Sequence, residues 1–95
     1  MRPEELRALA DPASLPPLLQ ALWHDAHGRW DAAHTIAQDI HTADAARVHA
    51  YLHREEGDDW NAGYWYRQAG QPRFTGSLED EWTALATAFL AQAPR

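Results

Sequence analysis

The stretch from Val48 to Gly70, VHAYLHREEGDDWNAGYWYRQAG, limits the possible folds more than any other part of the chain. Its polar segment EEGDD separates two halves that are rich in alanine and aromatic residues. A glycine often ends a helix, and an aspartate that follows it often caps the next helix. We therefore expect a helical hairpin whose residues Val48, Leu52 and Trp60 face the core.

The rest of the chain also has helical patterning. Alanine and leucine are abundant, and apolar and polar residues nowhere alternate over the length of a strand. The clearest stripe has the spacing i, i+3, i+4, i+7, i+8, i+11, which is typical of an amphipathic helix. Its members are Leu15, Leu18, Leu19, Leu22, Trp23 and Ala26. A second stripe, near the end of the chain, contains Leu78, Trp82, Leu85, Phe89 and Leu90.

Start and stop signals divide the chain into six helical segments. We expect caps at Ser14, at Asp58 or Asp59, and at Ser77. The predicted helices cover residues 3–10, from the Ser14 cap to Gly28, about 29–41, 44–56, 60–69, and the segment after Ser77. The sequence thus predicts an all-α fold, a compact bundle of about five helices plus a short N-terminal helix, forming a single domain over residues 1–95.

Composition excludes several functional classes. The chain has no cysteine, which rules out disulfides and thiolate chemistry. The formal net charge is −6 and every basic residue is arginine, so we expect neither nucleic acid nor an anionic membrane surface as a partner. No apolar run reaches the length of a signal peptide or a membrane span, and a cytoplasmic location is expected. No glycine-rich phosphate loop is present, and no cofactor is predicted.

Two segments of the chain echo each other about 29 to 30 residues apart. HGRWDAA and EGDDWNA each place a glycine, an aromatic residue, an Asp or Asn and a small residue in order. GRWDAA resembles part of a tetratricopeptide repeat, and YWYRQAGQP resembles the end of a Sel1-like repeat; both resemblances imply hairpins of that kind. The stretch from AHTIAQDI through VHAYLHREEGDDWNAGYWYRQAG also resembles small bacterial proteins of unknown function, which implies a compact single domain without specifying an activity.

The histidines form the one constellation that suggests chemistry. His34, Gln38 and His41 share one border of their helix, while His49 and His53 are an i, i+4 pair on the next helix. If the two helices are antiparallel neighbours, these borders meet. The resulting candidate ligand-binding residues are His34, Gln38, His49, His53, Asn61 and Tyr64.

Three roles are open for these histidines. The pair His49 and His53 is a workable two-ligand set for a transition metal, and a carboxylate from Glu55 or Glu56 lies close by in sequence. A histidine beside a carboxylate also suits general-base catalysis, which leaves enzymatic activity open. Alternatively, the imidazoles only form hydrogen bonds within the fold. His24 and His27 are expected to be solvated.

The aromatic residues suggest a second kind of site. Most of the five tryptophans are expected in the core, but tryptophan, tyrosine and arginine are also favoured at interfaces. Trp65, Tyr66 and Arg67 are the candidate interface residues, and burial in the core is an equally open alternative for them. The preferred prediction is therefore a helical protein-interaction or self-association domain that binds a protein partner or forms a homo-oligomer such as a dimer. The alternative is a small-molecule or metal-binding protein that uses the histidine-rich seam between the helices. Enzymatic activity is open for this alternative.

Overall fold

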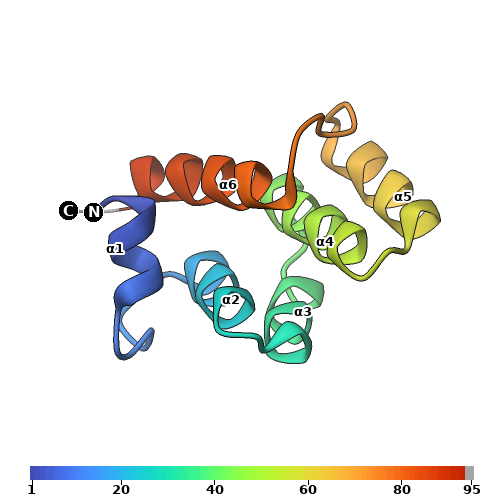
Figure 1. Cartoon of the computed structure of the whole chain (residues 1–95). Coiled ribbons are helices and arrows are strands. Elements are labelled where there is room, and N and C mark those ends of the chain that lie inside the picture. Colours follow the sequence, from blue (N-terminus) through green and yellow to red (C-terminus); the bar gives the residue numbers. More distant parts are fainter. Residues whose placement is uncertain (94–95) are drawn as a thin grey trace.

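Six α-helices make up the part of the chain that the computed structural model describes, residues 1–93 (Figure 1). The all-α prediction is confirmed, and the radius of gyration over Cα atoms, 12.2 Å, is that of a compact domain of this length. The helices are α1 (Pro3–Ala8), α2 (Pro17–Ala26), α3 (Trp30–Gln38), α4 (Ala43–Glu55), α5 (Asp59–Ala69) and α6 (Leu78–Gln92).

Side-chain caps begin three of the helices. Thr42, Asp58 and Ser77 each accept a hydrogen bond from the backbone N–H three residues later. The cap predicted at Ser77 is thus confirmed, and of the two alternatives Asp58 and Asp59 the structure has Asp58. The cap predicted at Ser14 is wrong, because α2 begins at Pro17 with Pro16 as its N-cap. A proline in the first turn already has a helical φ and has no N–H that needs a cap.

Besides α2, two helices are shorter than predicted. α1 ends at Ala8 because the backbone of Leu9 is extended, with ψ at 141°. α3 ends at Gln38, where the chain tightens into i→i+3 hydrogen bonds, as in the bond from the Ile40 N–H to the Ala37 carbonyl. The linker that results runs from Asp39 to Thr42.

The main core is closed by tryptophan side chains that bond to the backbone of other segments. In each case the indole N–H, which would be costly to bury without a partner, donates to a carbonyl oxygen. These bonds run from Trp23 to Leu9, from Trp30 to Leu52 and from Trp82 to Leu22, at 2.9, 2.8 and 3.0 Å. They connect α2 to the end of α1, α3 to α4, and α6 to α2.

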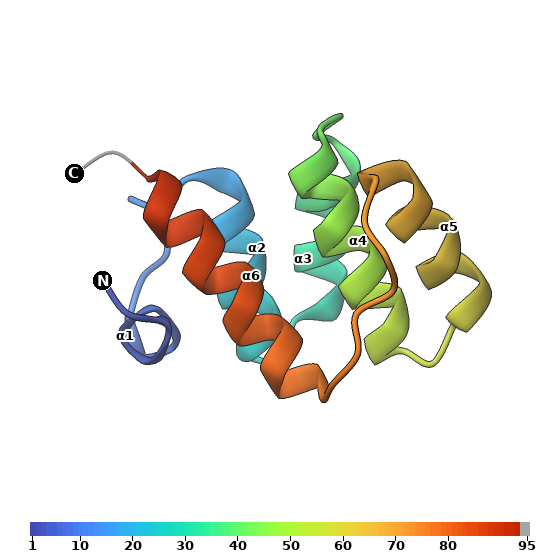
Figure 2. The ribbon, with the colours of Figure 1, turned by 90° about the horizontal axis from the view of Figure 1, so that it is seen from above.

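Helix α4 occupies the centre of the arrangement. It packs against α2, α3, α5 and α6, and Figure 2 shows α5 on its far side from α2 and α6. A smaller apolar cluster fills the space between α4 and α5, built on Ala50, Ala62 and Tyr66. Because α4 is buried on several sides, polar groups on it are forced close to other helices.

A buried charged group ties α4, α5 and α6 together. The carboxylate of Glu81 is on a residue that is only 3% exposed, and it accepts hydrogen bonds from Arg54 Nη1 at 2.8 Å and from the Tyr66 hydroxyl at 2.6 Å. Arg54 also donates to the carbonyl of Gly76 in the loop before α6. Tyr66 is therefore an internal residue, and of its two expected places the core is the one observed.

Trp60 lies on the surface, so the expectation that it faces the core is also wrong. Its side chain is 75% exposed, whereas Trp30, its counterpart in the sequence echo, is half-buried. Trp30 is the first residue of α3, but one extra residue after Gly57 makes Trp60 the second residue of α5. One position is about 100° of helix rotation, enough to turn the side chain from the core to solvent.

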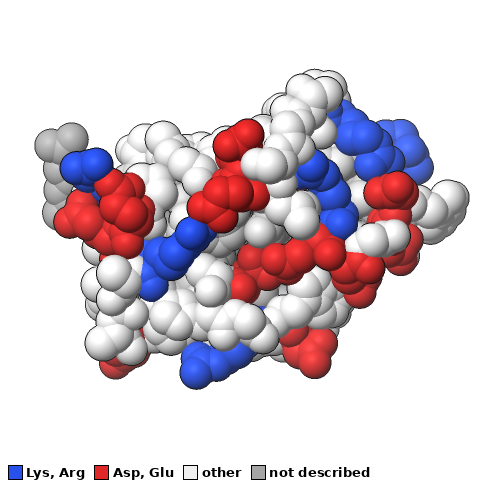
Figure 3. All heavy atoms as spheres, viewed as in Figure 1, with Lys and Arg blue, Asp and Glu red and all other residues white. Residues whose placement is uncertain are grey.

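The surface carries charges of both signs. Among the described residues on the face in Figure 3, acidic and arginine side chains lie next to one another rather than in one continuous basic field. None of the helices within residues 1–93 has the length and apolar content needed to cross a bilayer.

Candidate functional site

A groove lined by histidines lies between α3, α4 and α5. Its volume is about 560 Å³, and we call it the histidine groove. It is bordered by α3, by the linker after it, by one face of α4 and by the inner side of α5. The lining residues are His34, Gln38, Ile40, His41, Thr42, Ala43, Ala46, His49, His53, Trp65 and Gln68.

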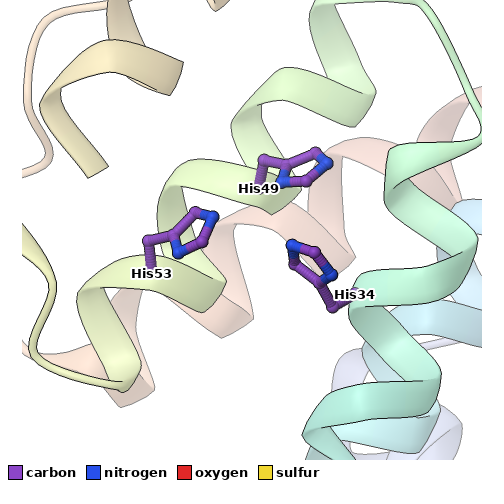
Figure 4. A group of neighbouring side chains, drawn as sticks. All are labelled: His34, His49 and His53. Atoms are coloured by element: carbon purple, nitrogen blue, oxygen red, sulfur yellow. The ribbon is translucent and has the colours of Figure 1, made fainter. Parts of the chain in front are cut away.

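Three imidazoles converge in the groove. His34 comes from α3, whereas His49 and His53 are one turn apart on α4, and Figure 4 shows the three rings facing a common space. One ring nitrogen from each histidine lies within 4.8 Å of the other two. The ring centroids are 4.8 Å apart for His34 and His49, 5.4 Å for His34 and His53, and 5.8 Å for His49 and His53.

Two tryptophans hold these rings in place. The indole of Trp30 lies one helical turn before His34 and stacks on its imidazole, with centroids 4.8 Å apart and planes inclined by 12°. Trp30 is itself fixed by its hydrogen bond to Leu52 of α4. On the other side, Trp65 of α5 stacks on His49 at 4.0 Å. His34 and His49 therefore have restricted orientations before any ligand binds.

His49 is a buried polar residue whose hydrogen-bonding capacity is not used. It is 4% exposed, and neither Nδ1 nor Nε2 has a hydrogen-bond partner among residues 1–93. Burial, followed by the charges that His34 and His53 would carry, lowers the pKa of His49 to about 4. The imidazole is thus neutral at pH 7 and offers a lone pair to an electrophile.

A carboxylate orients the imidazole of His53. Its Nδ1 lies 2.7 Å from Glu56 Oε1, and in the neutral ring a hydrogen bond donated to this carboxylate places the proton on Nδ1 and the lone pair on Nε2. This arrangement is common behind metal-bound histidines, because it fixes the tautomer and raises the basicity of the ring. Burial, and secondarily His53, lowers the pKa of His34, while Glu56 and Asp31 oppose this effect.

The other predicted ligand-binding residues divide into two groups. Gln38 and also His41 line the histidine groove with the three converging histidines. Asn61 and Tyr64 do not line it. The Asn61 amide donates to Asp58 at 2.5 Å as part of the α5 cap, and Tyr64 is 38% exposed on the outer side of α5.

The predicted interface residues are also separated by the fold. Trp65 is half-buried against His49, Tyr66 is buried, and Arg67 is exposed. The exposed aromatic pair on this helix is instead Trp60 and Tyr64, whose rings are parallel within 9° at 6.4 Å.

His24 and His27 do not behave alike, although both were expected in solvent. His27 is exposed, but its ring stacks on Trp23 at 4.0 Å and its Nε2 lies 2.9 Å from the Arg7 carbonyl. His24 is half-buried, so its expected solvation is wrong, and burial lowers its pKa. Neither residue lines the histidine groove.

Sequence reasoning missed the role of Trp30 and of the start of α4. The spacing of four between Trp30 and His34 is a signal that was readable, because such pairs meet on a helix surface. Thr42 and Ala43 line the groove next to the linker that follows α3, and no sequence pattern indicated the early end of α3.

A second polar cluster lies between α2 and α4, outside the groove. The Tyr51 hydroxyl is 3.0 Å from Asp25 Oδ2 and 3.4 Å from Glu55 Oε2. Burial, the hydrogen bond with Asp25 and its negative charge together raise the pKa of Glu55 to about 8, and burial with the two acids raises the pKa of Tyr51. The cluster thus holds a proton at neutral pH, and its hydrogen bonds join α2 to α4 within the fold.

The three-histidine arrangement suits a transition metal. Tetrahedral zinc with nitrogen ligands at about 2.0–2.1 Å requires nitrogens about 3.3 Å apart, so modest changes in side-chain torsions would bring these three to ligand distance. The second group with suitable spacing is His53, Glu56 and Asp58. Its carboxylates are already bonded, to His53 and Asn61 respectively.

No protein-family model, curated protein or solved structure matches this chain. The resemblances to tetratricopeptide and Sel1-like hairpins and to small bacterial proteins therefore stay predictions.

Proposed function

We propose that this protein binds a divalent transition-metal ion, with zinc as the best fit, through His34, His49 and His53. The observation that carries the proposal is the convergence of three ring nitrogens within 4.8 Å in a groove. Three neutral imidazoles are a known ligand set for zinc, and histidine suits zinc, copper and nickel more than magnesium or calcium.

The state of His49 adds an energetic argument. A buried N–H or ring nitrogen without a partner costs about 1–3 kcal/mol, and both ring nitrogens of His49 are in that position within the described chain. A metal ion would satisfy one of them. Because the pKa of His49 is lowered to about 4, binding at pH 7 displaces no proton from this residue.

The test is metal titration of metal-free protein produced without a histidine tag. We expect one zinc or cobalt ion per chain by isothermal titration calorimetry. The affinity should fall by at least about a hundredfold in His34→Ala, since a ligand is removed. His41→Ala is the matched control, because His41 lines the same groove outside the converging group. Equal losses in the two variants, or no binding by the wild type, would contradict the proposal.

The second candidate function is the protein-interaction or self-association domain, with a protein partner or a second copy of the chain. It is supported by Trp60, a large aromatic residue that is 75% exposed and parallel to Tyr64 on the outer side of α5. Tryptophan and tyrosine are frequent energetic anchors at interfaces. Arg67 is exposed on the same helix and stays a candidate.

Light scattering over a range of protein concentrations tests self-association. We expect the wild type to form a dimer that Trp60→Ala weakens. Trp60 is on the surface, so this variant should keep its thermal stability. A wild type that is monomeric at all concentrations excludes self-association, and a dimer unaffected by Trp60→Ala excludes this surface.

A further inference from the structure

The histidine groove supplies only three ligands to a tetrahedral ion. None of the residues that line it is aspartate or glutamate. Glu56 is the carboxylate bonded to one of the proposed ligands, at His53 Nδ1, and it does not line the groove. A fourth ligand must therefore come from solvent or from a bound molecule, as in zinc sites that keep an open position.

The electrostatics of the groove favour an anion in that position. Three neutral imidazoles do not reduce the 2+ charge of the ion, and no carboxylate lines the groove to bind it. Glu56 and Asp31 act on the histidines from outside the lining and compensate this charge only in part. A bound cation of this kind is the dominant local charge in its site. The lining also lacks arginine, so attraction for an anion depends on the metal.

The groove has room for more than a water molecule. Its volume of about 560 Å³ compares with about 30 Å³ for a water in the liquid, and lies in the range of small-molecule sites. Ile40, Ala46 and Trp65 give it apolar walls, and the amides of Gln38 and Gln68 are polar groups beside them. This combination suits a short organic chain with polar ends.

The groove reaches the N-terminus of α4, which is a second electropositive point. Thr42, the N-cap, and Ala43 line it there. Thr42 Oγ1 accepts from the Ala45 N–H, but the Ala43 and Asp44 N–H groups have no acceptor within residues 1–93. The Asp44 carboxylate does not line the groove and lies 3.6 Å from Arg47. Free N–H groups at a helix start favour carboxylates.

These two points lie along one helix. Ala43 and His49 are six residues apart on α4, which is about 9 Å along the helix axis. His49 is 4% exposed with unpartnered nitrogens, so the groove contains a buried group that needs a ligand at one end and free backbone donors at the other.

Resting on the proposed metal function, we infer that the histidine groove binds a small organic dicarboxylate. One carboxylate completes the coordination of the metal held by His34, His49 and His53. The other accepts hydrogen bonds at the start of α4, and the carbon chain between them lies against Trp65.

The experiment uses cobalt(II)-loaded protein, whose visible absorption reports on the coordination of the ion. Succinate, glutarate and adipate are titrated beside monocarboxylates of equal chain length, namely butyrate, pentanoate and hexanoate. We expect every carboxylate to change the spectrum. The best dicarboxylate should act at about one tenth of the concentration of its matched monocarboxylate, since a helix N-terminus contributes on that scale.

One substitution removes a single N–H at the start of α4. Ala43 is the first helical residue, where proline is well tolerated, and the extended backbone of Thr42 is compatible with a following proline. Because the Asp44 N–H remains, Ala43→Pro should reduce the tenfold advantage of the dicarboxylate without altering the response to the monocarboxylate. Leu78→Pro is the control, because it makes the same change at the start of α6, away from the groove.

The outcomes separate the two proposals. Failure of the wild type to bind cobalt overturns the proposed function and this inference together. Cobalt binding with a spectrum that no carboxylate changes overturns the inference alone. Three results would overturn the role of α4: equal potency of matched mono- and dicarboxylates, an advantage that Ala43→Pro leaves unchanged, or an advantage that Leu78→Pro reduces as much as Ala43→Pro does.

Discussion

The imidazole of His49 lies parallel to the indole of Trp65, with ring centroids 4.0 Å apart and planes inclined by 13°. The first ring belongs to α4 and the second to α5, so the stack joins the two halves of the central hairpin. It also places a natural fluorophore in direct contact with a proposed metal ligand. Optical measurements on tryptophan can therefore report on the groove.

Paramagnetic metal ions quench the emission of nearby indoles, which leads to a first prediction. We expect copper(II) or cobalt(II) to reduce the tryptophan fluorescence of the wild type, with saturation at one ion per chain. Trp65→Phe should keep its metal affinity and lose a large part of the quenching. Trp60→Phe is the control, since this exposed residue is not in the groove. Unchanged quenching in Trp65→Phe would place the ion elsewhere.

The second prediction concerns acid stability. With a pKa of about 4, folded His49 stays neutral as the pH falls below 6.5, while the unfolded chain takes up a proton there. Protons bind more to the unfolded state in this interval, so stability decreases as the pH falls from 6.5 to 4. From pH 7.5 to 4.5 this effect should lower the free energy of unfolding by roughly 2–3 kcal/mol.

Urea denaturation at the two pH values measures this effect. His49→Phe should lose less stability than the wild type between pH 7.5 and 4.5, by about the stated amount. His41→Phe, changed at an exposed histidine, should keep the pH dependence of the wild type. The same slope in all three proteins would show that His49 titrates normally.

The third prediction concerns Glu55 and has the opposite sign. Its pKa is raised to about 8 in the folded protein, so the folded state holds a proton that the unfolded state has lost above pH 4.5. Stability should therefore fall as the pH rises from 4.5 through 8. Glu55→Gln mimics the protonated carboxyl and should be most stabilising, relative to the wild type, at pH 9. Glu4→Gln, on the exposed first helix, should have the same small effect at pH 5 and pH 9.

The fourth prediction concerns the ion pair between Arg54 and Glu81. Arg54→Met leaves a carboxylate without its cation on a residue that is 3% exposed. Breaking a buried pair in this way costs about 3–5 kcal/mol. Arg2→Met breaks the exposed pair with Glu4 and should cost at most about 1 kcal/mol. Similar losses from the two changes in urea denaturation would mean that Glu81 is solvated after α6 moves.

Much of the fold was predictable because the apolar residues repeat with the period of an α-helix. Leu19, Leu22 and Trp23 of the second helix are buried, as are Trp82, Leu85 and Phe89 of the last. The orientation of Trp60 was not predictable, because it depends on whether Asp58 or Asp59 caps α5. A shift of one residue at the start of α5 hardly changes the sequence pattern of caps and apolar residues. It has a large effect on the direction of the Trp60 side chain.

The candidate site was predictable only where it depends on one helix. The spacing of His49 and His53 places both on the same face of α4, and His34 and Gln38 similarly share a face of α3. Which residues of α5 meet them depends on the rotation of a separate helix. That rotation brings Trp65 and Gln68 to the groove and takes Asn61 and Tyr64 away from it, and no local pattern encodes it.

The indole bonds of the core have a consequence for how opening of the fold can be observed. The indole N–H groups of Trp23, Trp30 and Trp82 each donate to a carbonyl across a different contact between segments, whereas Trp60 is 75% exposed. These contacts join α2 to the end of α1, α3 to α4, and α6 to α2. In heavy water the Trp60 proton exchanges at once, and the other three exchange only when their own junction separates. The order in which these signals disappear from a nuclear magnetic resonance spectrum thus records which helices part first.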